Sequence, residues 1–302
     1  MDRLAALQTF VSVATTGSFS EAARRLKTSK SAVSRTIGAL ETQLGVRLLQ
    51  RTTRKLTLTE AGSGYRDRAQ RIIADLEDAD LALSNRPAAP RGRLKVSAPA
   101  SFGCLHLAPA IPAFLKLYPD LAVDLVMSNR FVDIVEEGFD AAVRIGAQDE
   151  SSLVARRLAP IRRVVCASPG YFRRRGKPKT PEDLRQHDCL PLGEAPSARE
   201  WRFVGTDGTP LAVAANGRLS INNGEALRAA ALAGLGIVNL PSFIVGEDLK
   251  AGRLVSVLDA FVPQDTAVSV VYPEARHLSA KVRAFVDFLA GRFGPKPYWD
   301  KA

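Results

Sequence analysis

One expected helix near the start of the chain, residues 30–44, carries small and hydrogen-bonding side chains along one face. Its apolar residues recur at helical spacing and form a single stripe, made of Val33, Ile37, Leu40 and Leu44. The opposite face presents Ser31, Ser34 and Arg35. An arginine can bond bidentately to guanine in the major groove of DNA, and a serine can donate to or accept from a base edge. This face therefore predicts contacts with the bases of a DNA duplex.

The residues that precede this helix predict another helix and a tight turn. Ser18 and Glu21 have the spacing of a capping box, in which Glu21 reaches back to the Ser18 amide. Residues 27–29 predict a three-residue turn, with Ser29 as the cap of the following helix. Residues 19–38 thus have the size of a helix-turn-helix, whose second helix enters the major groove. A three-helix core with another role has the same pattern and remains an alternative.

A basic segment follows this helical region. Residues 46–59 hold two short β-rich runs on either side of residues 51–55, which predicts a two-stranded wing with a basic tip. The first sixty residues contain ten Lys or Arg and four Asp or Glu, in a chain of net charge +11. Positive charge concentrated at one end indicates a polyanion partner, although a solvated basic surface would have the same sum. The side chains expected to contact double-stranded DNA are Ser29, Lys30, Ser31, Ser34, Arg35, Arg51, Thr53 and Arg54.

A long helix is expected from about Glu60 to Asn85. Its apolar positions alternate spacings of four and three residues, at Tyr65, Ala69, Ile72, Leu76, Ala79 and Leu83. Such a heptad seam needs a partner helix, so it predicts a dimer held by Ile72, Leu76 and Leu83. The alternative is that the helix packs on the chain's own globular part. The Pro-rich, charged residues 86–93 predict a linker after the helix.

The rest of the chain alternates short apolar strands with helices. Strands are expected at 94–97, 122–127, 141–144, 163–167, 237–240 and 268–271, and helices at 103–117, 132–137, 223–233, 243–251 and 280–293. This alternation predicts an open α/β sheet that binds ligands at the carboxyl ends of its strands. The whole chain is therefore expected to belong to an α + α/β class.

Composition excludes several classes of protein. Of the 302 residues 46% are hydrophobic and 24% are charged, which excludes a disordered or collagen-like chain. Three cysteines without a CxxC spacing cannot build a disulfide framework, and they fit a reducing compartment. The start of the chain has no apolar signal segment, and the uncharged stretches 96–115 and 229–246 are broken by Pro or Gly. A cytoplasmic protein without a membrane span is expected.

Signals for an enzyme or a cofactor are weak. The sequence has no GxSxG, GxxxxGK[ST] or HExxH motif, and the glycine-rich residues 234–239 lack the third glycine of a dinucleotide site. His106, His187 and His277 are isolated in the sequence, so no metal site is expected. We therefore expect no catalysis and no cofactor.

Several longer runs resemble one family of proteins. The run from Leu7 to Gly62, which includes GSFSEAARRL, SAVSRTIGALETQLGVRLLQRTTR and LTLTEAG, is similar to the N-terminal domain of LysR-type transcriptional regulators. The runs GRLKVSAPASFG, VDIVEEGFDAAVRIG, RRVVCASPGYF and NNGEALRAAALAGLGI resemble that family's C-terminal effector domain. The resemblance covers essentially the whole chain. It implies a dimer or a dimer of dimers on an interrupted inverted repeat of DNA, controlled by a small-molecule inducer.

The resemblance also implies a division into domains. A winged helix-turn-helix would occupy residues 1–59, a coiled-coil dimerisation helix and hinge 60–90, and an effector-binding domain 91–302. That last domain would have the fold of type 2 periplasmic binding proteins. Its lobe I would comprise residues 91–162 and 269–302, and its lobe II residues 163–268, with the ligand between them.

The expected effector site combines this fold with the chemistry of helix starts. Ser101 precedes a helix of lobe I, and Asn223 starts a helix of lobe II. Free amides at helix starts favour anions, so the inducer is expected to carry a carboxylate or similar acceptor. The alternative is that Ser101 and Asn223 are only helix caps. Ser101, Phe102, Asn222 and Asn223 are expected to line the site from these helix starts, and the resemblance implies that Pro99, Phe131 and Arg144 line it as well.

Two other functions stay open at this level. A solute-binding receptor of periplasmic type would fit the C-terminal half, but it would have a signal peptide and no basic N-terminal domain. A redox-sensing regulator would use Cys104, Cys166 or Cys189 and would need a poised thiol pair. Cys104 and Cys166 instead lie in apolar segments, which favours buried, inert thiols.

Overall fold

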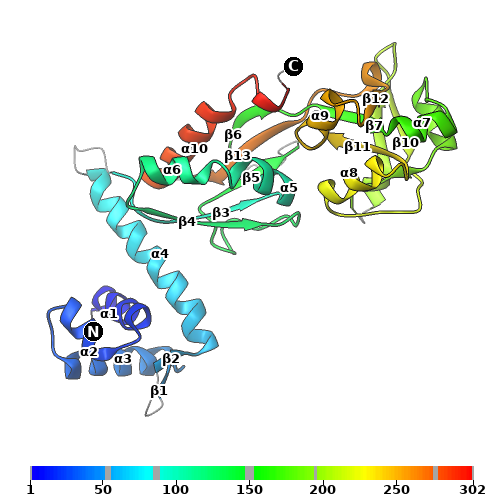
Figure 1. Cartoon of the computed structure of the whole chain (residues 1–302). Helices are drawn as coiled ribbons and strands as arrows, with labels where there is room; N and C mark the ends of the chain where they lie inside the picture. Colours follow the sequence, from blue (N-terminus) through cyan, green and yellow to red (C-terminus); the bar gives the residue numbers. More distant parts are fainter. Residues whose placement is uncertain are drawn as a thin grey trace. The chain divides into compact units, whose positions relative to one another are not determined.

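The computed structural model describes residues 2–51, 56–83, 89–146, 153–193, 196–274 and 278–300. The chain forms two compact units, Met1–Ala89 and Pro90–Ala302 (Figure 1). Among the described residues, the first unit is helical with one two-stranded sheet, and the second combines helices with three sheets. This is the predicted α + α/β class.

Three helices, a wing and a long helix make up the first unit. In chain order they are α1 (Arg3–Thr16), α2 (Phe19–Arg25), α3 (Lys30–Leu44), β1 (Leu49–Arg51), β2 (Leu56–Leu58) and α4 (Glu60–Leu83). Helix α3 buries Val33, Ile37 and Leu40, as its spacing predicts. Strands β1 and β2 pair in antiparallel register and form the wing. The wing's tip, residues 52–55, lies outside the described residues.

The turn between α2 and α3 follows local capping chemistry. The Ser18 hydroxyl accepts from the Glu21 amide at 3.3 Å, and the Ser29 hydroxyl accepts from the Ala32 amide at 3.1 Å. The reciprocal half of the predicted capping box is wrong. The Glu21 carboxylate pairs with Arg24 instead, and the Ser18 amide donates to the Thr16 hydroxyl at 3.4 Å. A nearby guanidinium thus displaces the backbone amide as the partner of Glu21.

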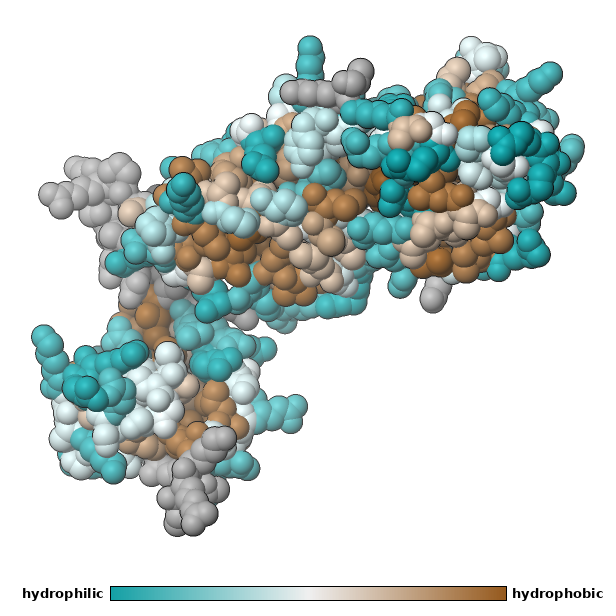
Figure 2. All heavy atoms as spheres, viewed as in Figure 1, coloured by the Kyte–Doolittle hydropathy of each residue, from teal (hydrophilic) through white to brown (hydrophobic). Residues whose placement is uncertain are grey.

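Helix α4 has two different surroundings along its length. Near its start, the ring of Tyr65 lies 5.5 Å from that of Phe10, and Ala69 is buried. These two positions therefore pack on the chain's own unit, which is the alternative to a seam. Farther along, Ile72 and Leu76 are 52% and 42% exposed, and Figure 2 shows apolar surface along this helix. The side chain of Leu83 lies outside the described residues.

The first lobe of the second unit is built on a five-stranded sheet of order β4-β3-β5-β13-β6. Its strands are β3 (Gly92–Ala98), β4 (Leu121–Met127), β5 (Ala141–Ile145), β6 (Leu153–Pro160) and β13 (Ala267–Pro273). Strand β3 runs parallel to β4 and β5, whereas β13 is antiparallel to β5 and β6. Helices α6 (Ile111–Leu117) and α10 (Ala280–Phe293) lie along this sheet in Figure 1.

The second lobe is built on a four-stranded sheet of order β12-β7-β11-β8. Its strands are β7 (Arg163–Ala167), β8 (Cys189–Leu190), β11 (Ile237–Pro241) and β12 (Val255–Val257), and a hairpin adds β9 (Glu200–Val204) and β10 (Pro210–Ala214). Its helices are α7 (Pro169–Arg175), α8 (Gly224–Leu232) and α9 (Ser242–Lys250). The chain leaves the first sheet after Pro160, enters the second at Arg163 and returns at Ala267. A hydrogen bond of 2.9 Å from the Ile161 amide to the Thr266 carbonyl joins the two crossings.

Two predicted helices of the first lobe are wrong in form. The segment 103–117 is interrupted: α5 (Ala100–Phe102) continues as a π-helical turn, Gly103–Leu107, and α6 begins only at Ile111. Proline cannot donate a backbone hydrogen bond, so Pro109 favours a break between the two pieces. Residues 132–137 form turns rather than a helix. The Asp133 carboxylate accepts the amides of Val135 and Glu136, at 3.0 and 2.9 Å, and so competes with helical bonding.

The sequence pattern also misses the strands β6, β8, β9, β10 and β12. Within the described ranges, no single helix is long and apolar enough to cross a membrane. One bent pair, Ala100–Leu107 with Ile111–Leu117, meets that test by length and composition only.

Candidate functional site

The polar face of α3 is open in the first unit. Lys30, Ser31 and Arg35 are exposed, and Ser34 is half-buried. The Ser31 hydroxyl lies 2.9 Å from that of Ser29, the cap of the helix. The side chains of Arg51, Thr53 and Arg54 lie outside the described residues. The described part of the predicted DNA-contacting set thus lies on one helix face.

The wing is fixed to α3 by contacts that the sequence analysis does not predict. Glu41, in the last turn of α3, accepts the amides of Leu48 and Leu49 at 2.8 and 3.0 Å. A Cβ atom at Gly62 would lie only 2.0 Å from the Leu48 carbonyl oxygen, so α4 approaches the wing where only glycine fits. The sequence signal for the contact made by Glu41 is a carboxylate four residues before Gly45, the glycine that ends α3. These contacts hold the wing in place beside the helix.

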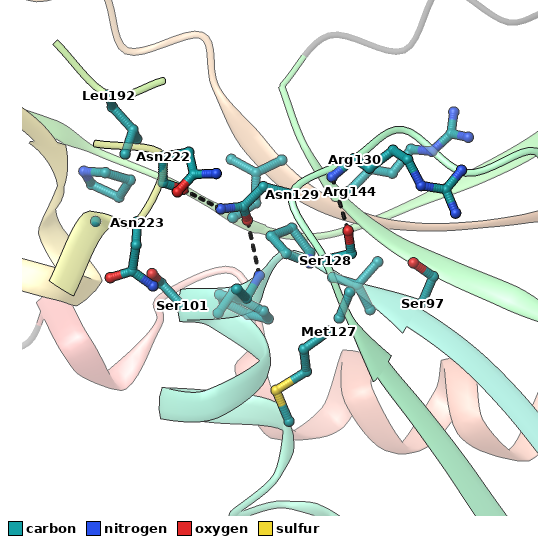
Figure 3. Close-up of a pocket in the computed structure, with 18 of the residues that line it drawn as sticks. Ser97, Ser101, Met127, Ser128, Asn129, Arg130, Arg144, Leu192, Asn222 and Asn223 are labelled. Atoms are coloured by element: carbon teal, nitrogen blue, oxygen red, sulfur yellow. Dashed lines mark hydrogen bonds between the residues drawn. The ribbon is translucent and has the colours of Figure 1, made fainter. Parts of the chain in front are cut away.

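The second unit has a pocket of about 860 Å³ between its lobes (Figure 3). It is lined by all seven residues of the predicted effector site: Pro99, Ser101, Phe102, Phe131, Arg144, Asn222 and Asn223. They come from the start of α5, the segment after β4, strand β5 and the start of α8. Residues that are up to 124 positions apart in the chain therefore meet in one cavity.

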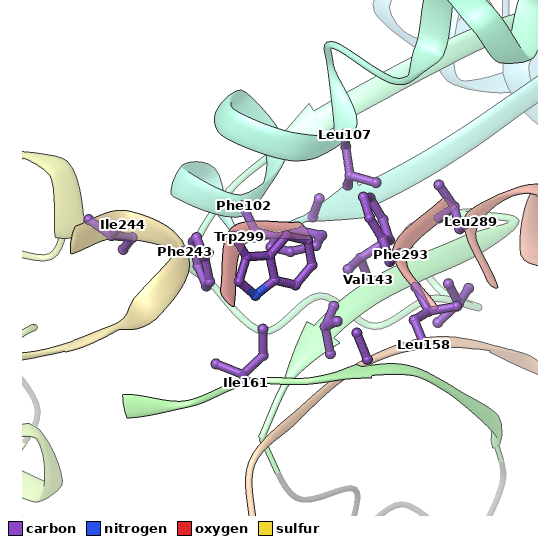
Figure 4. Close-up of a cluster of buried hydrophobic side chains, with 14 of the residues drawn as sticks. Phe102, Leu107, Val143, Leu158, Ile161, Phe243, Ile244, Leu289, Phe293 and Trp299 are labelled. Carbon is purple, nitrogen blue, oxygen red and sulfur yellow. The ribbon is translucent and has the colours of Figure 1, made fainter. Parts of the chain in front are cut away.

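The two phenylalanines of this set have different surroundings. Phe102 is fully buried, and its ring lies 5.3 Å from Phe243, 5.4 Å from Phe293 and 5.7 Å from Trp299 (Figure 4). Phe131 is 73% exposed, and the Arg144 guanidinium lies 4.6 Å from its ring centre. Phe102 is thus mainly a core residue between the lobes, whereas Phe131 presents an open aromatic face.

At each of the two helix starts, one amide is already bonded. The Asn223 side chain caps α8 by accepting from the Ala226 amide at 2.9 Å, which is the capping alternative for this residue. At the other helix start, the Ala100 amide donates to the Asn129 side chain at 3.0 Å. Ser101 is the middle residue of the three-residue helix α5 and does not cap it. The Ala100 and Ala226 amides are therefore not free to bind an anion.

Asn129 is a pocket residue that the sequence analysis misses. Besides accepting from Ala100 in lobe I, its amide group donates to the Asn222 carbonyl in lobe II (Figure 3). The lobes also meet beside it, since a Cβ atom at Gly224 would lie 3.5 Å from the Ser101 hydroxyl. One asparagine thus ties together the two segments that carry most of the predicted site.

The thiols and histidines do not form a reactive cluster within the described ranges. Burial raises the pKa of Cys166 and of Cys189 to about 12, which opposes a thiolate at either position. Cys104 is exposed. Where the structure describes the chain, no three His, Cys, Asp or Glu side chains could hold a metal ion. His277 lies outside the described residues.

His106 is buried in the aromatic cluster around Phe102, and its Nδ1 lies 2.6 Å from the Tyr298 hydroxyl. Burial lowers its pKa from 6.5 to about 4, against a smaller opposing hydrogen bond at Phe243. The unfolded chain therefore binds the proton first as the pH falls, so the free energy of unfolding should decrease between pH 6.5 and about 4. The full loss is about 3 kcal/mol, at roughly 1.4 kcal/mol per pKa unit.

Urea unfolding of the full chain across this pH range would test this expectation. His106→Gln keeps a polar side chain but removes the titration, so its unfolding free energy should depend less on pH than that of the wild type. Parallel pH dependences in the two proteins would contradict the buried, neutral state of His106.

Two family descriptions match the chain. The bacterial regulatory helix-turn-helix of the lysR family matches residues 4–63, and the LysR substrate binding domain matches residues 87–294. The chain therefore belongs to the LysR-type transcriptional regulators, which are DNA-binding proteins, and the resemblance noted in the sequence is confirmed.

Curated relatives and solved structures are similar over nearly the full length. The uncharacterized HTH-type transcriptional regulator YhjC of Escherichia coli is 39% identical over 295 residues, which cover 96% of this chain and 98% of that protein. The HTH-type transcriptional regulator CrgA of Neisseria meningitidis is 37% identical, with 95% of this chain and 96% of that protein covered. The solved structure of CrgA has a TM-score of 0.61 at 36% identity, covering 95% of this chain and 97% of that one. These similarities favour neither the solute receptor nor the redox-sensing alternative.

Proposed function

We propose that this chain is a sequence-specific regulator whose DNA binding responds to a small-molecule effector held between the lobes of its second unit. The supporting observation is that all seven predicted effector residues line one pocket. The proposal includes an interrupted inverted repeat of double-stranded DNA as the target, a dimer or dimer of dimers as the binding form, and a cytoplasmic, non-enzymatic protein. An effector that contacts both lobes would favour one angle between them, and the dimer would pass that change to the spacing of its two reading heads.

Arg35→Ala tests the assignment of the reading face. Arg35 is exposed on the polar face of α3, so its loss should weaken binding to the cognate site by about 1–3 kcal/mol and relax the preference at one base pair.

Arg54→Ala should weaken binding to all DNA sequences about equally and flatten the salt dependence of binding by about one unit, since a wing arginine would contact phosphate. Gel-shift titrations against single-base variants of the operator measure both. Wild-type affinity in Arg35→Ala would place base recognition on another face.

Ser101→Ala tests the effector site. Loss of one hydrogen bond to a charged ligand group is worth about 1.5–3 kcal/mol, so the midpoint of the response should move by roughly tenfold or more. DNA affinity without effector should stay close to that of the wild type. A reporter titration with gel-shift controls measures both quantities. An unchanged midpoint, or an effector that binds outside the interlobe pocket, would argue against this site.

A further inference from the structure

The charge of the interlobe pocket comes from three arginines. Arg130, Arg144 and Arg163 line it, and among the described lining residues there is no Asp, Glu or Lys. Arg130 is already neutralised, because both of its terminal nitrogens donate to the Glu137 carboxylate, at 2.7 and 2.6 Å. Arg144 lies over Phe131 and donates to the Val132 carbonyl at 3.2 Å. The third arginine has a different environment.

Arg163 is the first residue of β7, where the chain enters the second lobe. Its Nε donates to the Asn239 side-chain oxygen at 3.1 Å, and its Nη2 donates to the Asn239 carbonyl at 2.5 Å. No ion pair links it to a carboxylate in the part of the chain that the structure describes. Its side chain is half-buried, and burial lowers the pKa of its guanidinium. A charge in such a place is costly unless a ligand or a counter-ion compensates it.

The remaining donors of Arg163 fit a planar anion. A guanidinium has five N–H groups in a rigid fork, and the bonds to Asn239 use one group on Nε and one on Nη2. No described residue accepts from the edge formed by Nη1 and Nη2, and its parallel donors match the two oxygens of a carboxylate. This edge is a second source of anion affinity beside the helix starts, where the Ala100 and Ala226 amides are already bonded to Asn129 and Asn223.

We propose that Arg163 anchors the effector and that the effector is a small organic acid whose carboxylate bonds bidentately to this guanidinium. The inference rests on the proposed function, because it assigns the ligand class of the same pocket. The open ring of Phe131 and the side chain of Ile244 supply apolar surface for the rest of the molecule. A carboxylate bonded to Arg163 would lie where the chain crosses between the lobes. It would be joined to β7 through Arg163 and to β11 through the hydrogen bonds of Arg163 to Asn239.

The test uses the full-length protein and matched pairs of probes. Each pair is a simple carboxylate and its neutral amide, such as acetate with acetamide and benzoate with benzamide, and inorganic phosphate serves as a non-planar anion. Thermal unfolding and titration calorimetry are recorded for the wild type, Arg163→Met, Arg163→Lys and Arg202→Met. Arg202 is a matched control because its side chain is 80% exposed on β9, away from the pocket lining.

We expect at least one carboxylate to stabilise the wild type and Arg202→Met more than its amide does. Arg163→Met should weaken that carboxylate's binding roughly tenfold or more, and Arg163→Lys should fall between, since it keeps the charge but not the fork.

Two results would overturn the inference: no preference of the wild type for any carboxylate over its amide, or an unchanged carboxylate affinity in Arg163→Met. Phosphate also bonds bidentately to a guanidinium, so phosphate binding as tight as carboxylate binding would overturn the assignment of a carboxylate as the ligand group. A neutral effector found in the pocket would overturn the anion assignment and leave the proposed function standing. An effector bound elsewhere would overturn both.

Discussion

Leu76→Glu is expected to convert the proposed dimer into a monomer. Ile72 and Leu76 are exposed on α4 in the single chain, beyond the turns that pack on α1. In a paired seam, each helix would bury a carboxylate without a partner, at a cost of about 3 kcal/mol or more. The dimer dissociation constant should rise roughly 100-fold or more. Sedimentation velocity at a series of concentrations measures this change directly.

DNA binding should fall together with dimerisation. Two linked reading heads bind an inverted repeat with a high effective concentration, and separate heads lose that gain. Gln70→Glu is a suitable control, because it adds the same charge to an exposed position of α4 outside the seam. The control should remain a dimer. If Leu76→Glu also remains one, the main interface lies outside α4, most simply in the effector unit.

Phe102→Ala is expected to destabilise the second unit by about 3–5 kcal/mol, the range for removing a large buried aromatic side chain. The ring is fully buried and contacts Phe243 of lobe II together with Phe293 and Trp299 of lobe I (Figure 4). Its removal leaves a cavity where the two lobes meet. Equilibrium unfolding in urea, followed by the fluorescence of Trp299 and Trp201, measures the loss.

Phe131→Ala provides the contrast within the same pocket. Because Phe131 is 73% exposed, its loss should change the unfolding free energy by only about 0.5 kcal/mol or less. Equal, small effects at both positions would mean that Phe102 serves the ligand rather than the core. A large effect at Phe102 alone would support its role in holding the lobes together.

The elements that sequence analysis predicts well are those with strong local signals. Helix α3 has a clear apolar stripe and a serine cap, and both are present in the structure. Helix 132–137 fails because its apolar spacing ignores Asp133, whose side chain bonds to nearby amides instead. The short strands β8 and β12 contain only two and three residues, too few for an alternating pattern to stand out.

The prediction of the pocket residues rests on the resemblance to a family together with the positions of Ser101 and Asn223 at helix starts. Seven predicted residues line one cavity, and the Ala100 and Ala226 amides at its helix starts are already bonded within the chain. Asn129 and Arg163 were missed because their importance comes from partners 93 and 76 positions away. Such long-range contacts produce no periodic pattern in the sequence, so they are identified only from the folded lobes.

The bridge made by Asn129 sets a threshold for signalling. One such hydrogen bond contributes about 1 kcal/mol net, which favours the bridged arrangement of the lobes roughly fivefold at room temperature. A ligand that needs another interlobe angle must exceed this bias through its own difference in affinity for the two arrangements. Weakly discriminating metabolites would occupy the pocket without moving the lobes. The Asn129 side chain, which joins Ala100 to Asn222, would thereby restrict the response to those bound molecules that change the interlobe angle.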